Sequence, residues 1–162
     1  MSRVDIYTDG SFNRLDKFRT RGAIIVLIDG VPVYAENYDV QIKAFVDMWN
    51  VGGELWAAIT GLTVAGAISE PNSVLNIYYD YKGIRELIIG TPKWKPKKPG
   101  SLYYVKAYED FVEKNPSVKV NFYKVKAHTG NKYNELVDDL TRGDVAPELM
   151  KCYKGERLVR SK

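Results

Sequence analysis

The stretch VDIYTDGS, residues 4–11, decides how this 162-residue chain begins to fold. Val4, Ile6 and Thr8 alternate with residues of a different character, and a period of two predicts a β-strand with two unlike faces. The turn-forming sequence Asp9-Gly10-Ser11 ends the predicted strand. The chain therefore opens with a strand that carries a carboxylate at its end.

A β-hairpin follows this strand. The apolar run AIIVLI, residues 23–28, meets Asp29-Gly30, which is a strong signal for a type I′ turn, and a second strand returns over residues 31–38. Pro32 has no amide hydrogen to donate to a neighbour. We therefore expect the returning strand to lie at a sheet edge or to begin with an irregularity.

Beyond the hairpin, helical and strand patterns alternate. Helices are predicted over 51–69, 82–89, 103–114 and 131–142, strands over 74–79 and 118–125, and a basic loop over 91–100. The order βββαβααβα predicts an α/β fold in which helices flank a five-stranded mixed sheet. We expect residues 1–143 to form one domain and residues 144–162 to form a polar C-terminal tail.

The composition is that of a globular protein, with 45% hydrophobic and 27% charged residues. No uninterrupted apolar run approaches the roughly 18 residues of a membrane span, and the first residues do not resemble a secretory signal. Cys152 is the single cysteine, which excludes an internal disulfide and a cysteine metal cluster. We predict a cytoplasmic protein without membrane contact.

The net charge of +4 is unevenly distributed. Residues 82–132 hold 12 Lys and Arg against 4 Asp and Glu, whereas the rest of the chain holds 12 against 16. A segregated basic segment suits a polyanion, because neutralising phosphates releases counterions. A solvated lysine-rich face explains the charge equally well.

Four carboxylates fall where this fold would gather them. Asp9 and Asp80 end two strands, Glu54 begins the first long helix, and Asp138 lies in the last helix. Each has an ordinary explanation alone, as a turn former, a helix N-terminal acid or a solvated residue. Together they would repel one another unless hard divalent cations bound there, and oxygen ligands favour Mg²⁺ or Mn²⁺.

His128 is the single histidine and follows the last predicted strand. A lone histidine is commonly structural or simply exposed. In a loop beside an acidic site, however, it suits a mobile proton carrier near neutral pH.

Four ordered motifs resemble type 1 ribonuclease H over residues 3–143. They are YTDGS at 7–11, NVGGELWAA at 50–58, IYYDYKGI at 77–84 and VKAHTGNKYNELVD at 125–138. The Tyr-Asp-Tyr sequence around residue 80 and the lysine loop around Trp94 are most similar to the bacterial branch. We expect no separate hybrid-binding domain before the first strand. The stretch from Phe12 to Arg21 departs from the glycine-rich turn found in many members.

The resemblance implies an RNase H-like fold and an endoribonuclease that hydrolyses the RNA strand of RNA–DNA hybrids, leaving 5′-phosphate and 3′-hydroxyl ends. It implies two Mg²⁺ ions, with Mn²⁺ as a substitute, about 4 Å apart. The implied metal ligands are Asp9, Glu54, Asp80 and Asp138, and His128 would assist protonation and product release. The candidate substrate contacts are Ser11, Asn13, Asn50, Trp94 and Asn134.

Three points stay open at this stage. Trp94 could contact a sugar or base, or anchor the lysine loop. Another nuclease or recombinase with the same sheet is the first alternative function, since a fold alone does not decide chemistry. The second is a non-catalytic domain that binds hybrids or a partner protein. We expect the chain to be a monomer.

Overall fold

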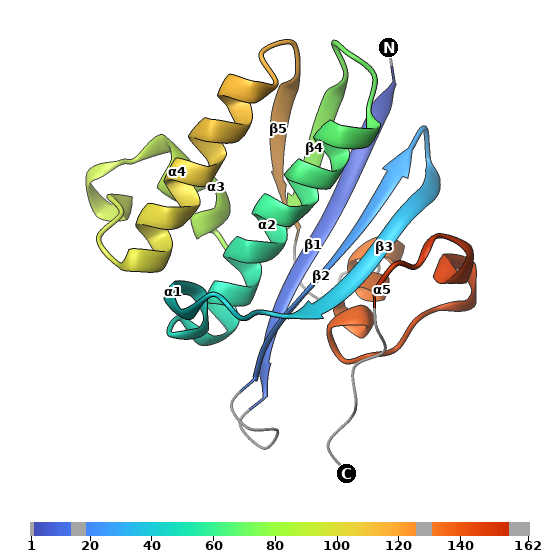
Figure 1. Cartoon of the computed structure of the whole chain (residues 1–162), viewed down its shortest axis with the longest axis horizontal. Coiled ribbons are helices and arrows are strands. Elements are labelled where there is room, and N and C mark those ends of the chain that lie inside the picture. The colour runs from blue at the N-terminus through green and yellow to red at the C-terminus, as the bar shows by residue number, and fades with distance from the viewer. Residues whose placement is uncertain (1, 14–18, 126–130, 156–162) are drawn as a thin grey trace.

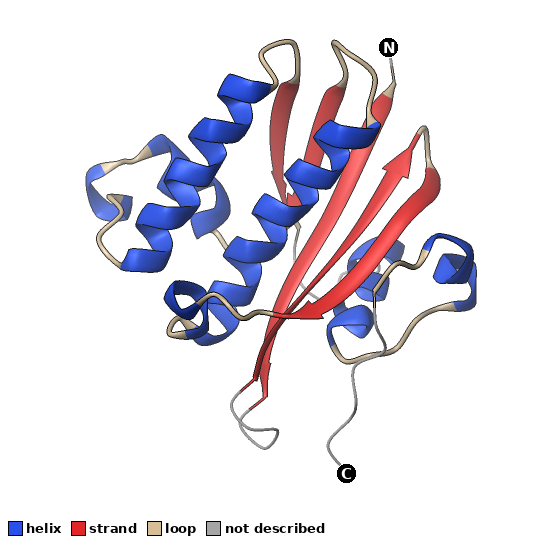
Figure 2. Cartoon of the chain, in the orientation of Figure 1, coloured by secondary structure: helices blue, strands red, loops and turns tan. Residues whose placement is uncertain are grey.

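The computed structural model describes residues 2–13, 19–125 and 131–155. A five-stranded sheet with the order β3-β2-β1-β4-β5 runs through the centre (Figures 1 and 2). β1 is antiparallel to β2 and parallel to β4, so the sheet is mixed, as predicted. The strands are β1 Arg3–Asn13, β2 Arg19–Ile28, β3 Val31–Asp39, β4 Val74–Tyr79 and β5 Lys119–Lys124.

The predicted hairpin joins β2 to β3. Asp29 has a φ of 49° and Gly30 a φ of 84°, and two positive values are what a type I′ turn requires. β3 is an edge strand, and its register with β2 shifts between Val26 and Leu27. Both expectations from Pro32 are therefore confirmed.

Helices cover both faces of the sheet. In Figure 1, α2 and α4 lie across one face, and α5 lies behind the other. The helices are α1 Lys43–Val46, α2 Trp49–Ile68, α3 Gly83–Ile89, α4 Pro99–Lys114 and α5 Lys132–Thr141, with 3-10 helices η1 Pro92–Trp94 and η2 Pro147–Cys152.

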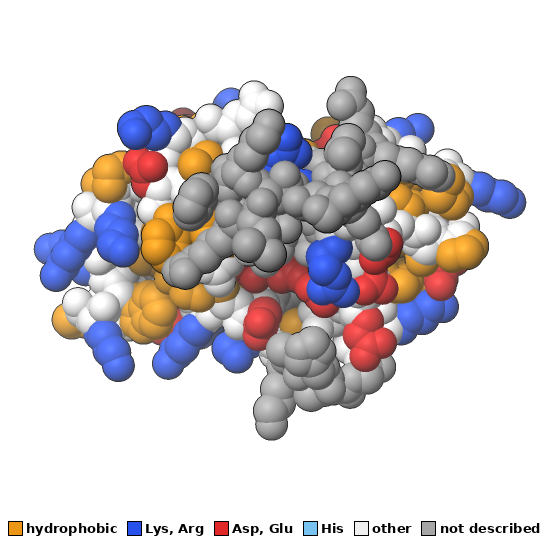
Figure 3. Space-filling model, turned by 90° about the horizontal axis from the view of Figure 1, so that it is seen from below, with side chains coloured by type: hydrophobic (Ala, Val, Ile, Leu, Met, Phe, Trp, Pro, Cys, Tyr) orange, Lys and Arg blue, Asp and Glu red, His pale blue; other side chains and the backbone are white. Residues whose placement is uncertain are grey.

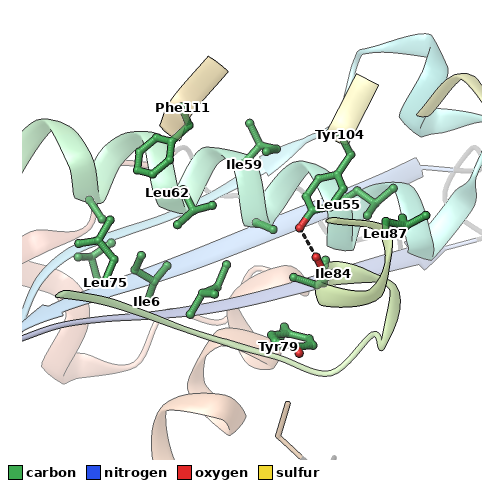
Figure 4. Close-up of a cluster of buried hydrophobic side chains, with 14 of the residues drawn as sticks. Ile6, Leu55, Ile59, Leu62, Leu75, Tyr79, Ile84, Leu87, Tyr104 and Phe111 are labelled. Atoms are coloured by element: carbon green, nitrogen blue, oxygen red, sulfur yellow. Dashed lines mark hydrogen bonds between the residues drawn. The ribbon is translucent and has the colours of Figure 1, made fainter. Parts of the chain in front are cut away.

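The sheet separates two hydrophobic cores. Under α2 and α4, fully buried side chains such as Ile6 and Leu62 pack together, and the Tyr104 hydroxyl donates a hydrogen bond to the Ile84 carbonyl oxygen (Figure 4). On the other face, α5 and η2 pack against β1, β2 and β3. Because side chains alternate along β1, the strand contributes Ile6 to the first core and Tyr7 to the second.

The structure corrects four sequence expectations. β1 does not end at Asp9-Gly10-Ser11 but continues to Asn13, because these residues stay paired with β2. Residues 147–152 form η2 instead of a polar tail, and Leu149 is fully buried against the second core. α4 begins at Pro99 rather than at residue 103, with proline in the first turn, where its missing amide hydrogen costs nothing. α1 was not predicted, because one helical turn is too short to show a period.

α2 is long and apolar enough to resemble a membrane-spanning helix. It has 20 residues, and an 18-residue window within it has a mean hydropathy of 1.4, which is high enough to cross a membrane by length and composition alone. It contacts β1, β2 and β4 and buries ten of its residues. The core helix of a folded domain can be equally long and apolar, and the packing of α2 against the sheet explains its apolar character.

Candidate active site

Asp9 and Asp80 lie close together because their strands are parallel neighbours. Tyr7 of β1 pairs with Tyr78 of β4, and each aspartate follows its tyrosine by two residues, on the same face. β4 ends at Tyr79, whereas β1 continues paired with β2. The two carboxylates therefore mark the point where β1 loses its neighbour β4.

Glu54 reaches this point because α2 begins in backbone contact with β1 and β2. A Cβ atom on Gly10 would lie 2.2 Å from the Glu54 amide nitrogen, and one on Gly53 would lie 2.3 Å from the Arg21 carbonyl oxygen. Only glycine permits so close an approach. The Gly10 amide also donates to Asp9 Oδ1 at 2.9 Å. The two glycines thus set the positions of the Asp9 and Glu54 carboxyls.

α5 supplies the fourth carboxylate. Asn131 caps this helix, since its side-chain oxygen accepts a hydrogen bond from the Asn134 amide at 3.1 Å. Asn134 and Asp138 are four residues apart and therefore share one helix face. Arg142, one turn further, donates to Asp138 Oδ2 at 2.9 Å and to Asp139 Oδ1 at 2.8 Å.

These elements surround an open cleft of about 300 Å³. Seen from below, acidic side chains gather near the middle of this end of the molecule, with a basic side chain among them (Figure 3). All four predicted carboxylates and two predicted substrate residues line the cleft. Its lining residues are Asp9, Gly10, Asn50, Glu54, Asp80, Asn134, Glu135, Asp138 and Arg142.

The cleft favours protonated carboxyls when no cation is present. Burial raises the pKa of Asp9 to about 7; a hydrogen bond with Glu54 lowers it, and the neighbouring Asp138 raises it. Burial, followed by the charge of Asp9, raises the pKa of Glu54 well above its usual value. Both groups are therefore ready to exchange a proton for a metal ion.

One buried oxygen tests whether a metal ion fits this site. Glu54 Oε2 is buried and has no hydrogen-bond partner in the described part of the chain. Such an oxygen is costly to leave unsatisfied, and a hard divalent cation would satisfy it. The all-oxygen donor set of the cleft also suits Mg²⁺.

Among the described residues, the acidic side chains of the cleft do not form a complete metal-binding site. Within residues 2–13, 19–125 and 131–155, no three His, Cys, Asp or Glu side chains are arranged so that they could hold one metal ion. Arg142 holds the Asp138 carboxylate in an ion pair. A metal ion bound by Asp138 would therefore compete with this ion pair.

The remaining predicted site residues lie outside the cleft lining. Ser11 is on β1, beyond the first carboxylate, and Asn13 pairs with β2 through its backbone. Trp94 packs edge-to-face on Tyr81 at 6.1 Å between ring centroids, which is what an anchor for the lysine loop would do. It lines a second pocket of about 200 Å³ together with Lys93, Lys95, Lys97 and Lys98. His128 lies outside the described residues.

Sequence reasoning missed two charged residues of the cleft, Glu135 and Arg142. The signal for Arg142 was available, because an Asp and an Arg four residues apart on a predicted helix are expected to pair. Glu135 lies in the first turn of α5, where an acidic residue is explained by the helix dipole alone.

Comparison with known proteins agrees with this architecture. Ribonuclease H of Brucella anthropi is 29% identical over 154 residues, which cover 91% of this chain and 92% of that protein. Ribonuclease H of Clostridium botulinum is 29% identical over 147 residues, covering 86% of this chain and 93% of that protein.

Solved structures show the same fold at lower identity. RNase H1 from the archaeon Halobacterium salinarum superimposes with a TM-score of 0.64 at 16% identity, covering 85% of this chain and 93% of that one. The N-terminal RNase H domain of a Mycobacterium tuberculosis protein superimposes with a TM-score of 0.66 at 18% identity. The match covers 87% of this chain and 94% of that one. The RNase H family model matches residues 1–146. With that match over most of its length, and with the four predicted carboxylates around one cleft, the chain belongs to the RNase H family.

Proposed function

We propose that this chain hydrolyses the RNA strand of RNA–DNA hybrids with the help of Mg²⁺ and leaves 5′-phosphate and 3′-hydroxyl ends. The observation that carries the proposal is the open cleft that is lined by Asp9, Glu54, Asp80 and Asp138 together. Family membership supports the reaction class. A solved neighbour, LC11-RNase H1, was determined in complex with an RNA/DNA hybrid, which supports the substrate class.

The four carboxylates would hold two Mg²⁺ ions. When bound, these ions supply the charge that activates a water molecule and stabilises the leaving oxygen. The residues that would bind them are Asp9, Glu54, Asp80 and Asp138.

The amide side chains of Asn50 and Asn134 also line the cleft. They can hydrogen-bond to 2′-hydroxyl groups, which DNA lacks, and so favour RNA in the cut strand.

Two further parts of the chain belong to the proposal. His128, which follows β5 in the sequence, would carry protons during turnover. The lysines around Trp94 would hold backbone phosphates without reading the base sequence. We also propose that the chain acts as a monomer in the cytoplasm.

A cleavage assay with end-labelled strands tests the reaction. Hybrid, duplex RNA and duplex DNA of the same sequence are incubated with Mg²⁺, with Mn²⁺ or with EDTA. We expect cleavage of the RNA strand of the hybrid only, and only with metal. Asp9→Asn and Asp80→Asn should each abolish it while the fold is kept, since amides are poor ligands for these cations. Asp110→Asn is the matched control, because Asp110 is a half-exposed residue of α4 that pairs with Lys106 outside the cleft.

Each alternative has its own outcome in this assay. Cleavage of duplex DNA would assign the chain to another class of nuclease on the same fold. Tight binding of intact hybrid in Mg²⁺ and Mn²⁺ would make it a binding domain. Unchanged cleavage by Asp9→Asn would place the metal site elsewhere. His128→Ala should slow turnover without abolishing it.

A further inference from the structure

A row of tyrosines crosses the sheet on the face opposite α2 and α4. Tyr7, Tyr78 and Tyr123 stand side by side on β1, β4 and β5, because the strand registers pair Tyr7 with Tyr78 and Tyr78 with Tyr123. The Tyr7 and Tyr78 rings are stacked, with centroids 4.5 Å apart and planes 7° apart. The Tyr78 and Tyr123 rings are also stacked, with centroids 5.3 Å apart and planes 23° apart. Tyr133 of α5 packs against the inner end of this row, at 5.7 Å from Tyr7.

The tyrosine row (Tyr7, Tyr78 and Tyr123) borders the candidate active site. Asp9 and Asp80 occupy the next positions on the same face of β1 and β4. One step along two parallel strands therefore leads from the carboxylates to the stacked rings. Tyr7 is buried in the second core, so a nucleic acid strand that leaves the cleft in this direction would meet Tyr78 and Tyr123.

The floor beyond the tyrosine row is polar. The Asn76 side chain donates to Asp5 Oδ1 at 3.1 Å, and the Asn121 side chain donates to Asn76 Oδ1 at the same distance. Arg3 balances the buried Asp5 carboxylate at 3.0 Å. These hydrogen bonds link β1, β4 and β5 beside the tyrosine row.

The outer end of the row is open. α5 contacts β1, β2 and β3, while Tyr123 stands on the edge strand β5 and is 46% exposed. One face of its ring stacks on Tyr78, and among the described residues no other ring stacks on the second face. Lys119 lies exposed at the start of β5 and shares the face of Tyr123, whereas Lys124, the residue after Tyr123, faces the other side of the sheet. An open aromatic face with a cation on the same side suits single-stranded nucleic acid.

We propose that the tyrosine row binds an unpaired extension of the nucleic acid whose hybrid part occupies the cleft, with one base stacked on Tyr123. This inference rests on the proposed function, because it takes the cleft as the hybrid site. Stacking uses the π-face that every base has, so the site accepts any base sequence. Lys119, on the same face of β5, neutralises a phosphate of the extension.

Equilibrium binding measured by fluorescence anisotropy tests the proposal. The probes are a blunt hybrid and the same hybrid with an unpaired RNA extension at one or the other end, in EDTA so that no cleavage occurs. We expect one of the extended probes to bind about tenfold more tightly than the blunt probe, which is the contribution of one stacked base.

Three variants separate stacking from a general loss of structure. Tyr123→Ala should remove the gain from the extension and leave the affinity for the blunt hybrid unchanged. Tyr123→Phe should keep the gain, because it keeps the ring. Tyr103→Ala is the matched control, since Tyr103 is 43% exposed on α4 at the other face of the sheet. Urea unfolding of each variant shows that the fold is intact.

The outcomes distinguish this inference from the proposed function. Equal binding of blunt and extended probes, or a gain that survives in Tyr123→Ala, would overturn the tyrosine site even if the hybrid is cleaved. If the blunt hybrid is neither bound nor cleaved, the proposed function fails. Binding of the extension strand alone then tests the tyrosine site. Binding that Tyr123→Ala abolishes would support the site, and binding that Tyr123→Ala leaves unchanged would overturn it.

Discussion

Replacing Gly53 by alanine should damage the cleft far more than it damages the fold. A Cβ at this position would lie 2.3 Å from the Arg21 carbonyl oxygen and 3.2 Å from the Gly10 Cα. Real Cβ atoms essentially never come closer than 3.0 Å to a neighbouring heavy atom. Both neighbours are backbone, so the start of α2 must move away from the sheet.

The two effects on stability partly cancel. Alanine in place of glycine gains about 1 kcal/mol of helix propensity. Overpacking of a tight contact costs about 1–3 kcal/mol. We therefore expect Gly53→Ala to lower the free energy of unfolding by about 1 kcal/mol. Catalysis is more sensitive, because Asp9 and Glu54 lie on the two sides of this contact, and a displacement of about 1 Å reduces rates roughly 100-fold.

Gly66→Ala is the matched control within the same helix. Its Cβ would meet the Phe111 ring at 2.8 Å and the Asn115 side chain at 3.2 Å, and side chains can yield where backbone cannot. Urea unfolding gives the stability of both variants, and hybrid cleavage at saturating Mg²⁺ gives their kcat/KM. A Gly53→Ala variant that keeps the wild-type kcat/KM, or loses no more than Gly66→Ala, would show that this backbone contact does not position the carboxylates.

Other features of the molecule give further predictions. Because the pKa values of Asp9 and Glu54 are raised, the folded chain holds their protons more tightly than the unfolded chain. In EDTA, these two groups should therefore stabilise the fold below about pH 4 and lose that effect as the pH rises toward about 7. Urea unfolding across this range tests the sign, and saturating Mg²⁺ should reduce the dependence. Arg142→Gln should strengthen Mg²⁺ binding in calorimetric titration, because the guanidinium no longer competes for the α5 carboxylate; an unchanged affinity would contradict this. Its effect on stability should stay below about 1 kcal/mol, since the ion pairs are partly exposed. Leu149→Ala should cost about 2–4 kcal/mol in urea unfolding, because the side chain is fully buried, whereas the exposed Met150→Ala should cost little.

The order of the strands and the position of the cleft could be predicted because local signals determine them. Asp29-Gly30 specified the hairpin, and the two-residue period of the first strand specified which residues share a face. Asp9 and Asp80 could be placed together from the order of the strands, although only β4 ends beside them and β1 continues to Asn13. These features depend on residues close in sequence or on one strand pairing.

The parts that could not be predicted depend on distant contacts. Leu149 sits in a segment without periodicity, and its burial is decided by β3, more than 100 residues earlier. The closeness of Glu54 to Asp9 depends on backbone contacts that Gly10 and Gly53 permit, and a glycine in a sequence does not reveal what approaches it. The tyrosine row became visible only when register had placed Tyr123 beside Tyr78.

Residues 153 and 154 also shield part of one edge of the sheet from solvent. Tyr153 forms a parallel bridge with Ala35, and the Lys154 amide donates to the Ala35 carbonyl oxygen at 2.8 Å. The edge strand β3 is therefore covered at Ala35 by its own chain, while lysines at both ends of the short β5 discourage pairing with another strand. Uncovered edges recruit other strands and lead to aggregation. A chain shortened before Tyr153 would thus lose solubility as well as stability, because the last described residues shield the edge strand from neighbouring molecules.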